Sequence, residues 1–245
     1  MNSVDVENVS GLTIGTKDCQ FVKQHIFLSG SIAVGKTTLM KELHSFFMNR
    51  DEFLFIREYI DYDTDGIKYL ERLQRGLMTN YQFQMYVLKC YEDQLNCLEF
   101  EGAEIIIWER HPYEALSIFC KNDQTLSVNE RLKIELRLDV LCEKYKIPKF
   151  GDKNIEYYDF DTAVIKTENI MKFIIGDIVY PMLMGEYDFN VFIFLYCSDL
   201  DEQFKRLIDR GRTIEVEVYK HKEDLLMVNN IYFSFYLTRK INLTN

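Results

Sequence analysis

The string GSIAVGKTT at residues 30–38 restricts the possible folds of this chain more than any other stretch. Its fixed positions are Gly30, Gly35, Lys36 and Thr37, with the spacing G-x-x-x-x-G-K-T. An apolar run, QHIFLS, comes directly before it, and KTTLMKELHSFFM follows with apolar residues at helical spacing. The stretch therefore predicts a buried strand, a glycine-bounded loop and a helix in direct succession. An ordinary glycine turn is the alternative.

A loop of this kind is suited to binding a nucleoside triphosphate. Its backbone N–H groups can surround a phosphate, the lysine can reach the outer phosphates, and the threonine hydroxyl can bind a magnesium ion. We therefore expect ATP and Mg²⁺ as ligands. The loop residues expected to bind ATP are Gly30, Ser31, Ala33, Gly35, Lys36, Thr37 and Thr38.

Length and composition indicate one globular domain. With 245 residues, 47% hydrophobic and 28% charged, the chain is long enough to bury a full core. Residues 1–20 show no strong period and are expected to form a disordered tail before a domain at 21–245. A net charge of −10 makes nucleic acid or an anionic membrane an unfavourable partner, since both attract basic surfaces.

The cysteines and the absence of a targeting segment favour an intracellular, cytoplasmic protein. No signal peptide and no apolar run of membrane-spanning length is recognised in the sequence. The six cysteines show no C-x-x-C spacing, which is typical of buried thiols in a reducing compartment rather than of zinc ligands or disulfides. They are Cys19, Cys90, Cys97, Cys120, Cys142 and Cys197.

Strands and helices are expected to alternate along the chain. Continuous apolar runs in FLFIREY, EIIIWER and FNVFIFLYC predict further buried strands, with helical patterns between them. Such an order is typical of an α/β fold, with a central parallel sheet covered by helices on both faces. Residues 80–100 and 217–236 are each expected to form one helix, and residues 148–165 an irregular or hairpin insertion.

Polar residues close three of the expected strands. In open α/β sheets ligands bind at the carboxyl ends of the strands, so these positions are candidate site residues. Glu58 is the expected general base, just beyond a strand expected next to the loop strand. Glu109 is expected to hold Mg²⁺ through water, and Arg110 to bind the transferring phosphoryl group. A strand that merely reaches solvent is the alternative for each.

Three arginines follow the last expected strand. Arg206, Arg210 and Arg212 lie where a helix is expected to break at Gly211. They can form a mobile lid that brings positive charge over the triphosphate, with Glu215 pointing to the acceptor. A solvated helix end is the alternative, because cations favour that terminus.

Five stretches in this order resemble the deoxynucleoside kinase family, including its herpesvirus-type thymidine kinase branch. They are GSIAVGKTT, REY, YQFQMY, ERHPYEA and RLIDRGRTIE. The resemblance implies the P-loop nucleoside and nucleotide kinase fold, and transfer of the ATP γ-phosphate to the 5′-hydroxyl of a deoxynucleoside. It also implies that the lid arginines bind phosphates, that Glu215 contacts the sugar 3′-hydroxyl, and that the protein forms a homodimer through helices beside the base pocket.

The resemblance also suggests how the base is recognised. Gln84 corresponds to the base-reading glutamine of the family, with Gln82 as the alternative register. Tyr91 and Phe119 fall where herpesvirus-type kinases have aromatic side chains, although core packing is the alternative. Deoxycytidine-preferring members have an arginine at the position of Tyr91 and an aspartate at that of Ala115. Their absence favours thymidine, or pyrimidine deoxynucleosides in general.

Departures from the family pattern keep two other functions open. Glu58 is followed by tyrosine instead of proline, the only tryptophan is Trp108, and residues 69–74 offer no clear counterpart of the tyrosine that holds the sugar. A thymidylate kinase is one alternative, with Arg57 as the cation for the acceptor phosphate. A catalytically inactive, nucleotide-binding regulatory protein is the other.

Overall fold

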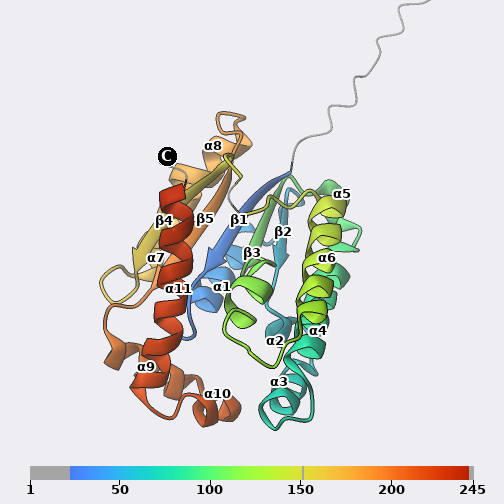
Figure 1. The fold of residues 1–245 in the computed structure, drawn as a ribbon. Coiled ribbons are helices and arrows are strands. Elements are labelled where there is room, and N and C mark those ends of the chain that lie inside the picture. Colours follow the sequence, from blue (N-terminus) through green and yellow to red (C-terminus); the bar gives the residue numbers. More distant parts are fainter. Residues whose placement is uncertain (1–22, 151, 243–245) are drawn as a thin grey trace, which may run out of the picture.

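A five-stranded, all-parallel sheet forms the centre of the molecule (Figure 1). The computed structural model describes residues 23–150 and 152–242, so the expected tail at 1–20 lies outside the described residues. The strand order is β2-β3-β1-β5-β4. The strands are β1 (Gln24–Ser29), β2 (Phe53–Ile56), β3 (Ile105–Glu109), β4 (Ile155–Asp161) and β5 (Asn190–Tyr196).

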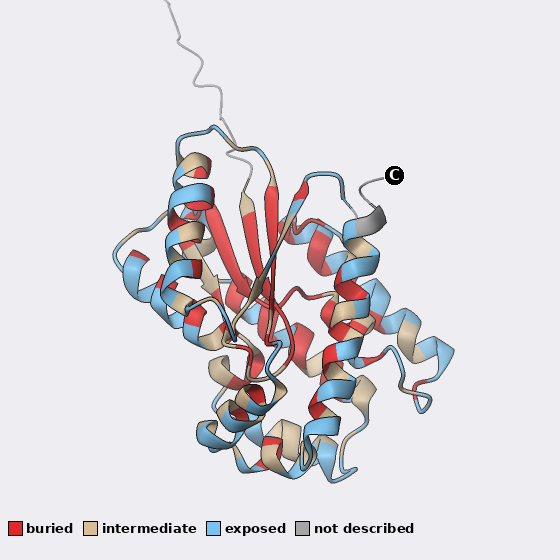
Figure 2. Cartoon of the chain, turned by 90° about the vertical axis from the view of Figure 1, so that its left-hand side faces the viewer, coloured by how far each residue is buried: buried red, intermediate tan, exposed pale blue. Residues whose placement is uncertain are grey.

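Helices cover both faces of this sheet, as predicted. Alternate residues of the central strands face two separate apolar clusters: Ile26 and Leu28 belong to one, and Phe27 to the other. The first cluster includes residues of α1 (Lys36–Phe47), α7 (Thr167–Phe173), the π-helical turn η2 (Ile174–Val179) and α8 (Tyr180–Leu183). The second includes residues of α4 (Asn80–Leu95), the π-helical turn η1 (Ala115–Phe119), α6 (Val128–Tyr145) and α11 (Lys222–Asn242). Figure 2 shows the buried strands between helices that are buried on one side only.

The segment 148–165 is not an insertion outside the sheet, contrary to expectation. It contains β4, which pairs in parallel with β5 from Ile155 opposite Asn190 to Asp161 opposite Tyr196. As an edge strand, β4 buries only Ile155 fully, and its sequence IEYYDFD therefore lacks the continuous apolar run that marks the central strands.

Two expected helices are each divided. The segment 80–100 consists of α4 and the short α5 (Glu99–Gly102), and the segment 217–236 begins in α10 (Thr213–Val218) before α11 starts at Lys222. Helix α9 (Leu200–Arg210) ends as predicted at Gly211, which adopts a left-handed conformation with φ of 71°. Two short helices, α2 (Tyr59–Tyr62) and α3 (Gly66–Gln74), complete the fold.

The strand order also corrects one expected neighbour. Strand β3, not β2, pairs with β1 beside the glycine-bounded loop, and β2 pairs with the far side of β3. Glu58, which follows β2, is thus one strand further from the loop than expected. Within the described part of the chain, no helix combines the length and the apolar character that crossing a membrane requires.

Candidate active site

The loop between β1 and α1 has the backbone of a phosphate-binding loop. Gly30, Ala33 and Gly35 have φ values of 138°, 58° and 98°, so the chain turns sharply before α1. A Cβ atom on Gly30 would lie 2.1 Å from the carbonyl oxygen of Leu195, which excludes any side chain there. No described side chain caps the first turn of α1, and its N–H groups are therefore available to an anion.

Lys36 is a buried cation at the start of α1. Its Nζ atom donates a hydrogen bond of 2.6 Å to the carbonyl oxygen of Ser31. Burial, followed by the nearby charge of Arg110, lowers the pKa of Lys36 to about 7. A polyphosphate beside this ammonium group would stabilise its charged form.

Thr37 and Glu109 form a pair that is suited to a magnesium ion. The Thr37 hydroxyl donates a 2.5 Å hydrogen bond to Glu109 Oε1, while the buried Oε2 atom has no hydrogen-bond partner among the described residues. Burial, and then the charge of Glu58, raises the pKa of Glu109. A hydroxyl and a carboxylate are oxygen ligands that Mg²⁺ prefers. The described residues contain no cluster of three or more His, Cys, Asp or Glu side chains able to hold a metal, so phosphate oxygens and water would have to complete the coordination.

Arg110 lies at the centre of a buried ionic cluster. Its Nε atom donates to Glu58 Oε1 at 2.8 Å, and its Nη1 atom donates to Glu114 Oε2 at 3.2 Å and to the carbonyl oxygen of Gly30 at 3.1 Å. The Tyr232 hydroxyl of α11 accepts a further hydrogen bond from Nη1 and donates to Glu114 Oε2. Arg110 has a φ of 76°, which is uncommon for a residue with a side chain and directs its guanidinium group back toward the loop.

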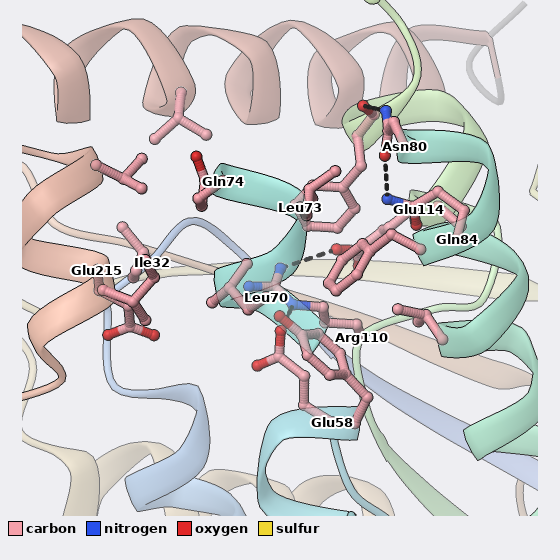
Figure 3. A pocket seen from close by; sticks show the side chains of 18 of the residues that line it. Ile32, Glu58, Leu70, Leu73, Gln74, Asn80, Gln84, Arg110, Glu114 and Glu215 are labelled. Atoms are coloured by element: carbon pink, nitrogen blue, oxygen red, sulfur yellow. Dashed lines mark hydrogen bonds and ion pairs between the residues drawn. The ribbon is translucent and has the colours of Figure 1, made fainter. Parts of the chain in front are cut away.

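The charge of Glu58 is strongly stabilised in this cluster. Burial by itself raises the pKa of its carboxyl, but the charges of Arg110 and Lys36 outweigh this effect and lower the pKa to about 2. Glu58 is therefore fully ionised at neutral pH. Although it follows a different strand from Arg110, the two side chains meet, as Figure 3 shows.

A cavity of about 430 Å³ opens beside this pair. All seven residues predicted to contact the acceptor line it: Glu58, Gln84, Tyr91, Arg110, Ala115, Phe119 and Glu215. Its volume is in the range of small-molecule pockets. We call it the acceptor cavity.

The acceptor cavity distinguishes the two candidate glutamines. Gln82 accepts a hydrogen bond from the Thr79 N–H group and thereby forms a capping box at the start of α4. Gln84 is buried and lines the cavity, and its Oε1 atom has no hydrogen-bond partner among the described residues. The geometry therefore favours Gln84 over Gln82 as a ligand-binding residue.

The aromatic residues differ in their burial. Tyr91 is buried and packs edge-on against Trp108, with ring centres 5.9 Å apart. Phe119 is 40% exposed at the edge of the cavity, where its ring centre lies 5.3 Å from the Cζ atom of Arg110. Ala115, which lies between Tyr91 and Phe119 in the sequence, is also buried and contributes only a methyl group to the cavity wall.

A second cavity, of about 520 Å³, lies over the glycine-bounded loop. We call it the phosphate cavity. Gly30 and Ser31 do not line it, although they shape the loop. Its lining residues are Ala33, Gly35, Lys36, Thr37, Thr38, Lys41, Glu42, Arg206, Arg210 and Arg212. Lys36, Thr37 and Arg210 also line the acceptor cavity, and the two cavities therefore meet at these residues.

The three predicted lid arginines have different partners. Arg206 donates to Glu202 at 3.1 Å and to the Thr162 carbonyl oxygen at 2.9 Å, whereas Arg212 forms ion pairs with Asp61 at 2.9 Å and Glu215 at 3.1 Å. Arg210 lies 3.7 Å from Glu215. Its buried Nη2 atom has no hydrogen-bond partner among the described residues.

Sequence reasoning missed Glu114 and Tyr232. Glu114 lies in the quoted stretch ERHPYEA, four residues after Arg110, and this spacing could have indicated a contact with the arginine. Tyr232 is 122 residues away from Arg110 in the chain, and it forms part of an apolar helical pattern that gives no sign of a polar role. Only the fold brings it to the site.

Comparison with known proteins identifies the family. The model of the deoxynucleoside kinase family matches residues 26–148. A structure of deoxyadenosine kinase from M. mycoides with dCMP and a flexible dCDP bound is 16% identical and has a TM-score of 0.50, over 88% of this chain and 84% of that chain. A second structure of that enzyme, with dATP bound, is 18% identical with a TM-score of 0.48, over 88% of this chain and 85% of that chain.

The match to the family model and the likeness to the solved structures support different conclusions. The search of curated proteins returned no match. At 16% identity the first structural likeness supports the fold alone. The family model, by contrast, covers 123 of the 245 residues (148 − 26 + 1), from within β1 to a point three residues after the end of α6. The segment includes the loop, Glu58, Gln84 and Arg110. The chain belongs to the deoxynucleoside kinase family.

Proposed function

We propose that the protein transfers the γ-phosphoryl group of ATP to the 5′-hydroxyl of a deoxynucleoside. The observation that carries this proposal is the junction of the two cavities at Lys36, Thr37 and Arg210. A triphosphate in one cavity and a nucleoside in the other would bring donor and acceptor together at that junction. Phosphoryl transfer depends mainly on such positioning and on neutralising charge.

In this proposal Glu58 binds the 5′-hydroxyl of the acceptor. Its carboxylate is ionised at neutral pH and is kept in position by Arg110. With a pKa of about 2 it is a weak base, and it therefore orients the hydroxyl and accepts its proton late, as the new O–P bond forms. Lys36, Arg110 and Arg210 would stabilise the negative charge of the transferring group.

Mg²⁺ fits the site at Thr37 and Glu109. Thr37 would hold the ion directly and Glu109 through water, as the unpartnered Oε2 atom suggests. When bound, the ion neutralises charge on the phosphate oxygens.

The charges around the acceptor cavity favour a nucleoside over a nucleoside monophosphate. A thymidylate kinase would require a further cation for the acceptor phosphate, besides Lys36 and Arg210, which also line the phosphate cavity. Arg57 is exposed and does not line the acceptor cavity. Arg110 is already paired with Glu58 and Glu114. An additional phosphate near these carboxylates would be repelled.

We further propose a preference for thymidine, or for pyrimidine deoxynucleosides. Ala115 leaves room in the wall of the cavity for the 5-methyl group of thymine, and Tyr91 supplies an aromatic surface without a charge. The amide of Gln84 can accept from and donate to the edge of the base.

A homodimer through α6 is part of the proposal. Four apolar side chains lie on this helix at intervals of four residues and are exposed: Val128 (73%), Leu132 (49%), Leu136 (63%) and Val140 (54%). An exposed apolar stripe of this kind is typical of a helix that packs against a partner. A second copy of the chain fits because the same stripe can pack against itself about a two-fold axis.

The experiment that tests the proposed function is an acceptor panel. Purified protein would be assayed with ATP and Mg²⁺ against thymidine, deoxycytidine, deoxyguanosine, deoxyadenosine and thymidine monophosphate. We expect thymidine to have the highest kcat/KM. Turnover of the monophosphate alone would assign a thymidylate kinase, and ATP binding without turnover of any acceptor would assign a regulatory protein.

A further inference from the structure

A chain of hydrogen bonds in the wall of the acceptor cavity determines how the Gln84 amide faces the ligand. The Asn80 Nδ2 atom donates to Asp123 Oδ2 at 2.9 Å and to the Phe119 carbonyl oxygen at 3.0 Å. Both partners can only accept, and the nitrogen of Asn80 must therefore face them. Its Oδ1 atom then faces Gln84 and accepts from Nε2 at 2.9 Å, a contact drawn in Figure 3.

This chain of hydrogen bonds ends at the side-chain amide of Gln84. Because Nε2 of Gln84 donates to Asn80, the Oε1 atom is the part of the amide left over, and it is buried without a hydrogen-bond partner among the described residues. A buried unpartnered carbonyl is costly, so a ligand N–H group should supply the missing bond. The second N–H of Nε2 remains available to donate beside it.

Asp123 is itself held in place. The Thr125 N–H and hydroxyl groups both donate to its Oδ1 atom, at 2.8 and 2.6 Å, which leaves Oδ2 for Asn80. Arg131 donates to the backbone carbonyl oxygens of Cys120 and Asp123, and thereby fixes the turn that carries the carboxylate. The orientation of the Gln84 amide is thus imposed by Asn80 and Asp123 in the wall of the cavity, with Thr125 and Arg131 behind them.

The orientation has a chemical consequence for base choice. Thymine and guanine present a carbonyl acceptor beside a ring N–H donor, whereas cytosine and adenine present an exocyclic amino donor beside a ring nitrogen acceptor. A glutamine amide pairs with either class, but with its oxygen and nitrogen in opposite positions. An amide that cannot rotate accepts one class and leaves mismatched donors and acceptors with the other.

We propose that Asp123, acting through Asn80, locks the Gln84 amide and thereby makes the site discriminate between keto and amino bases. Asp123 and Asn80 are positioning residues in this proposal. It rests on the proposed function, because it assumes that the acceptor cavity holds a nucleoside.

The variant Asp123→Asn tests the lock. In this variant the Thr125 donors keep the oxygen of the new amide, so its nitrogen faces Asn80 and competes with the Phe119 carbonyl oxygen for the orientation of that side chain. Asn80 is then held by one acceptor in place of two, and in part of the molecules it presents its nitrogen to Gln84 and reverses the amide. The readout is the ratio of the Kd values of thymidine and deoxycytidine, measured by calorimetry, which does not depend on turnover. We expect the ratio to move toward one by about tenfold, the effect of one hydrogen bond. Asp177→Asn, an exposed site in η2 on the other face of the sheet, is the matched control.

A double variant separates the lock from a general structural effect. In Asn80→Asp with Asp123→Asn, the asparagine at 123 donates to one oxygen of the carboxylate at 80, and the other oxygen again accepts from Gln84. The Phe119 carbonyl oxygen loses its donor, which weakens the binding of both nucleosides alike. We expect the original ratio to return, even where both affinities are weaker. If Asp123→Asn proves unfolded in a thermal melt, Asn80→Leu, which removes the acceptor facing Gln84, should shift the ratio to a similar extent.

The outcomes distinguish this inference from the proposed function. An unchanged ratio in folded Asp123→Asn or Asn80→Leu, or a shifted ratio that the double variant fails to restore, would overturn the lock. A wild type that favours deoxycytidine would contradict the thymidine preference, yet the lock would stand if the ratio still moved toward one. A wild type that binds no nucleoside would overturn both.

Discussion

The phosphate cavity and the acceptor cavity balance their charges in different ways. Among the described residues, the phosphate cavity is lined by five cations and one carboxylate, namely Lys36, Lys41, Arg206, Arg210 and Arg212 against Glu42. The acceptor cavity has three cations and four carboxylates, namely Lys36, Arg110 and Arg210 against Glu58, Glu114, Asp123 and Glu215. The phosphate cavity therefore carries a surplus of positive charge, while the acceptor cavity is close to neutral without a ligand.

The difference indicates what each cavity can bind. A surplus of positive charge beside backbone N–H groups suits a polyanion such as a triphosphate. A cavity whose charges are already paired suits an uncharged ligand, and its ion pairs serve to position Glu58. Substitutions on the two sides should therefore affect different substrates.

The largest effect is expected for Lys36→Met on the phosphate side. This change removes the buried ammonium group, and we expect kcat/KM for ATP to fall by about 10³-fold, as for loss of a strong transition-state donor. The Kd of the nucleoside should change less than this, because Lys36 lines the acceptor cavity only where that cavity meets the phosphate cavity, and calorimetry would measure it. An equal loss of nucleoside affinity would show that the two cavities are not independent.

Glu58→Gln should separate orientation from binding on the acceptor side. Glutamine keeps the shape and a hydrogen bond to Arg110 but cannot accept the proton, and we expect kcat to fall by roughly 10²-fold or more. Steady-state kinetics with varied nucleoside would measure kcat and KM separately. Near-wild-type turnover would exclude Glu58 as the base.

Binding of ATP should take up a proton above neutral pH. The pKa of Lys36 without ligand is about 7, and a bound phosphate raises it. From pH 8 to 9, where the phosphates of ATP are fully ionised, the free lysine is mostly neutral and must be protonated on binding. The affinity should thus fall with rising pH, by at most about tenfold per unit. Calorimetry in two buffers with different ionisation enthalpies would detect the uptake, and Lys36→Met should abolish it.

The smallest effect on either cavity is expected from Leu136→Glu on α6. The side chain is 63% exposed and lines neither cavity, so ATP and nucleoside affinities should stay within about twofold. A charge in the apolar stripe should nevertheless separate a dimer into monomers, which light scattering would measure. A wild type that is already monomeric would contradict the dimer.

The same contrast explains how much of the protein the sequence could predict. The phosphate loop is contiguous, and its glycines, lysine and threonine are recognisable because the backbone itself forms the site. Strands β1, β3 and β5 were predicted correctly because burial on both faces requires a continuous apolar run. The half-exposed β4 lacks that pattern, and its sequence therefore predicts an insertion in place of a strand.

The acceptor cavity was less predictable because long-range contacts build it. The ion pair of Arg110 with Glu58 joins residues 52 positions apart, and the contact of Arg110 with Tyr232 joins residues 122 positions apart. Resemblance to the family indicated the residues that line the cavity. The partners that hold them, such as Glu114 and Asn80, depend on how helices pack, and no local pattern encodes that packing.

The position of Tyr232 limits how far this protein can be divided. The segment that matches the family model ends at residue 148 and contains Glu58, Arg110 and Glu114, but the hydroxyl that completes their cluster comes from α11. A fragment without α11 would keep the recognisable motifs and lose a buried partner of their central arginine. The part of the chain that is recognisable from its sequence is therefore shorter than the part needed to complete the site, which extends at least to Tyr232.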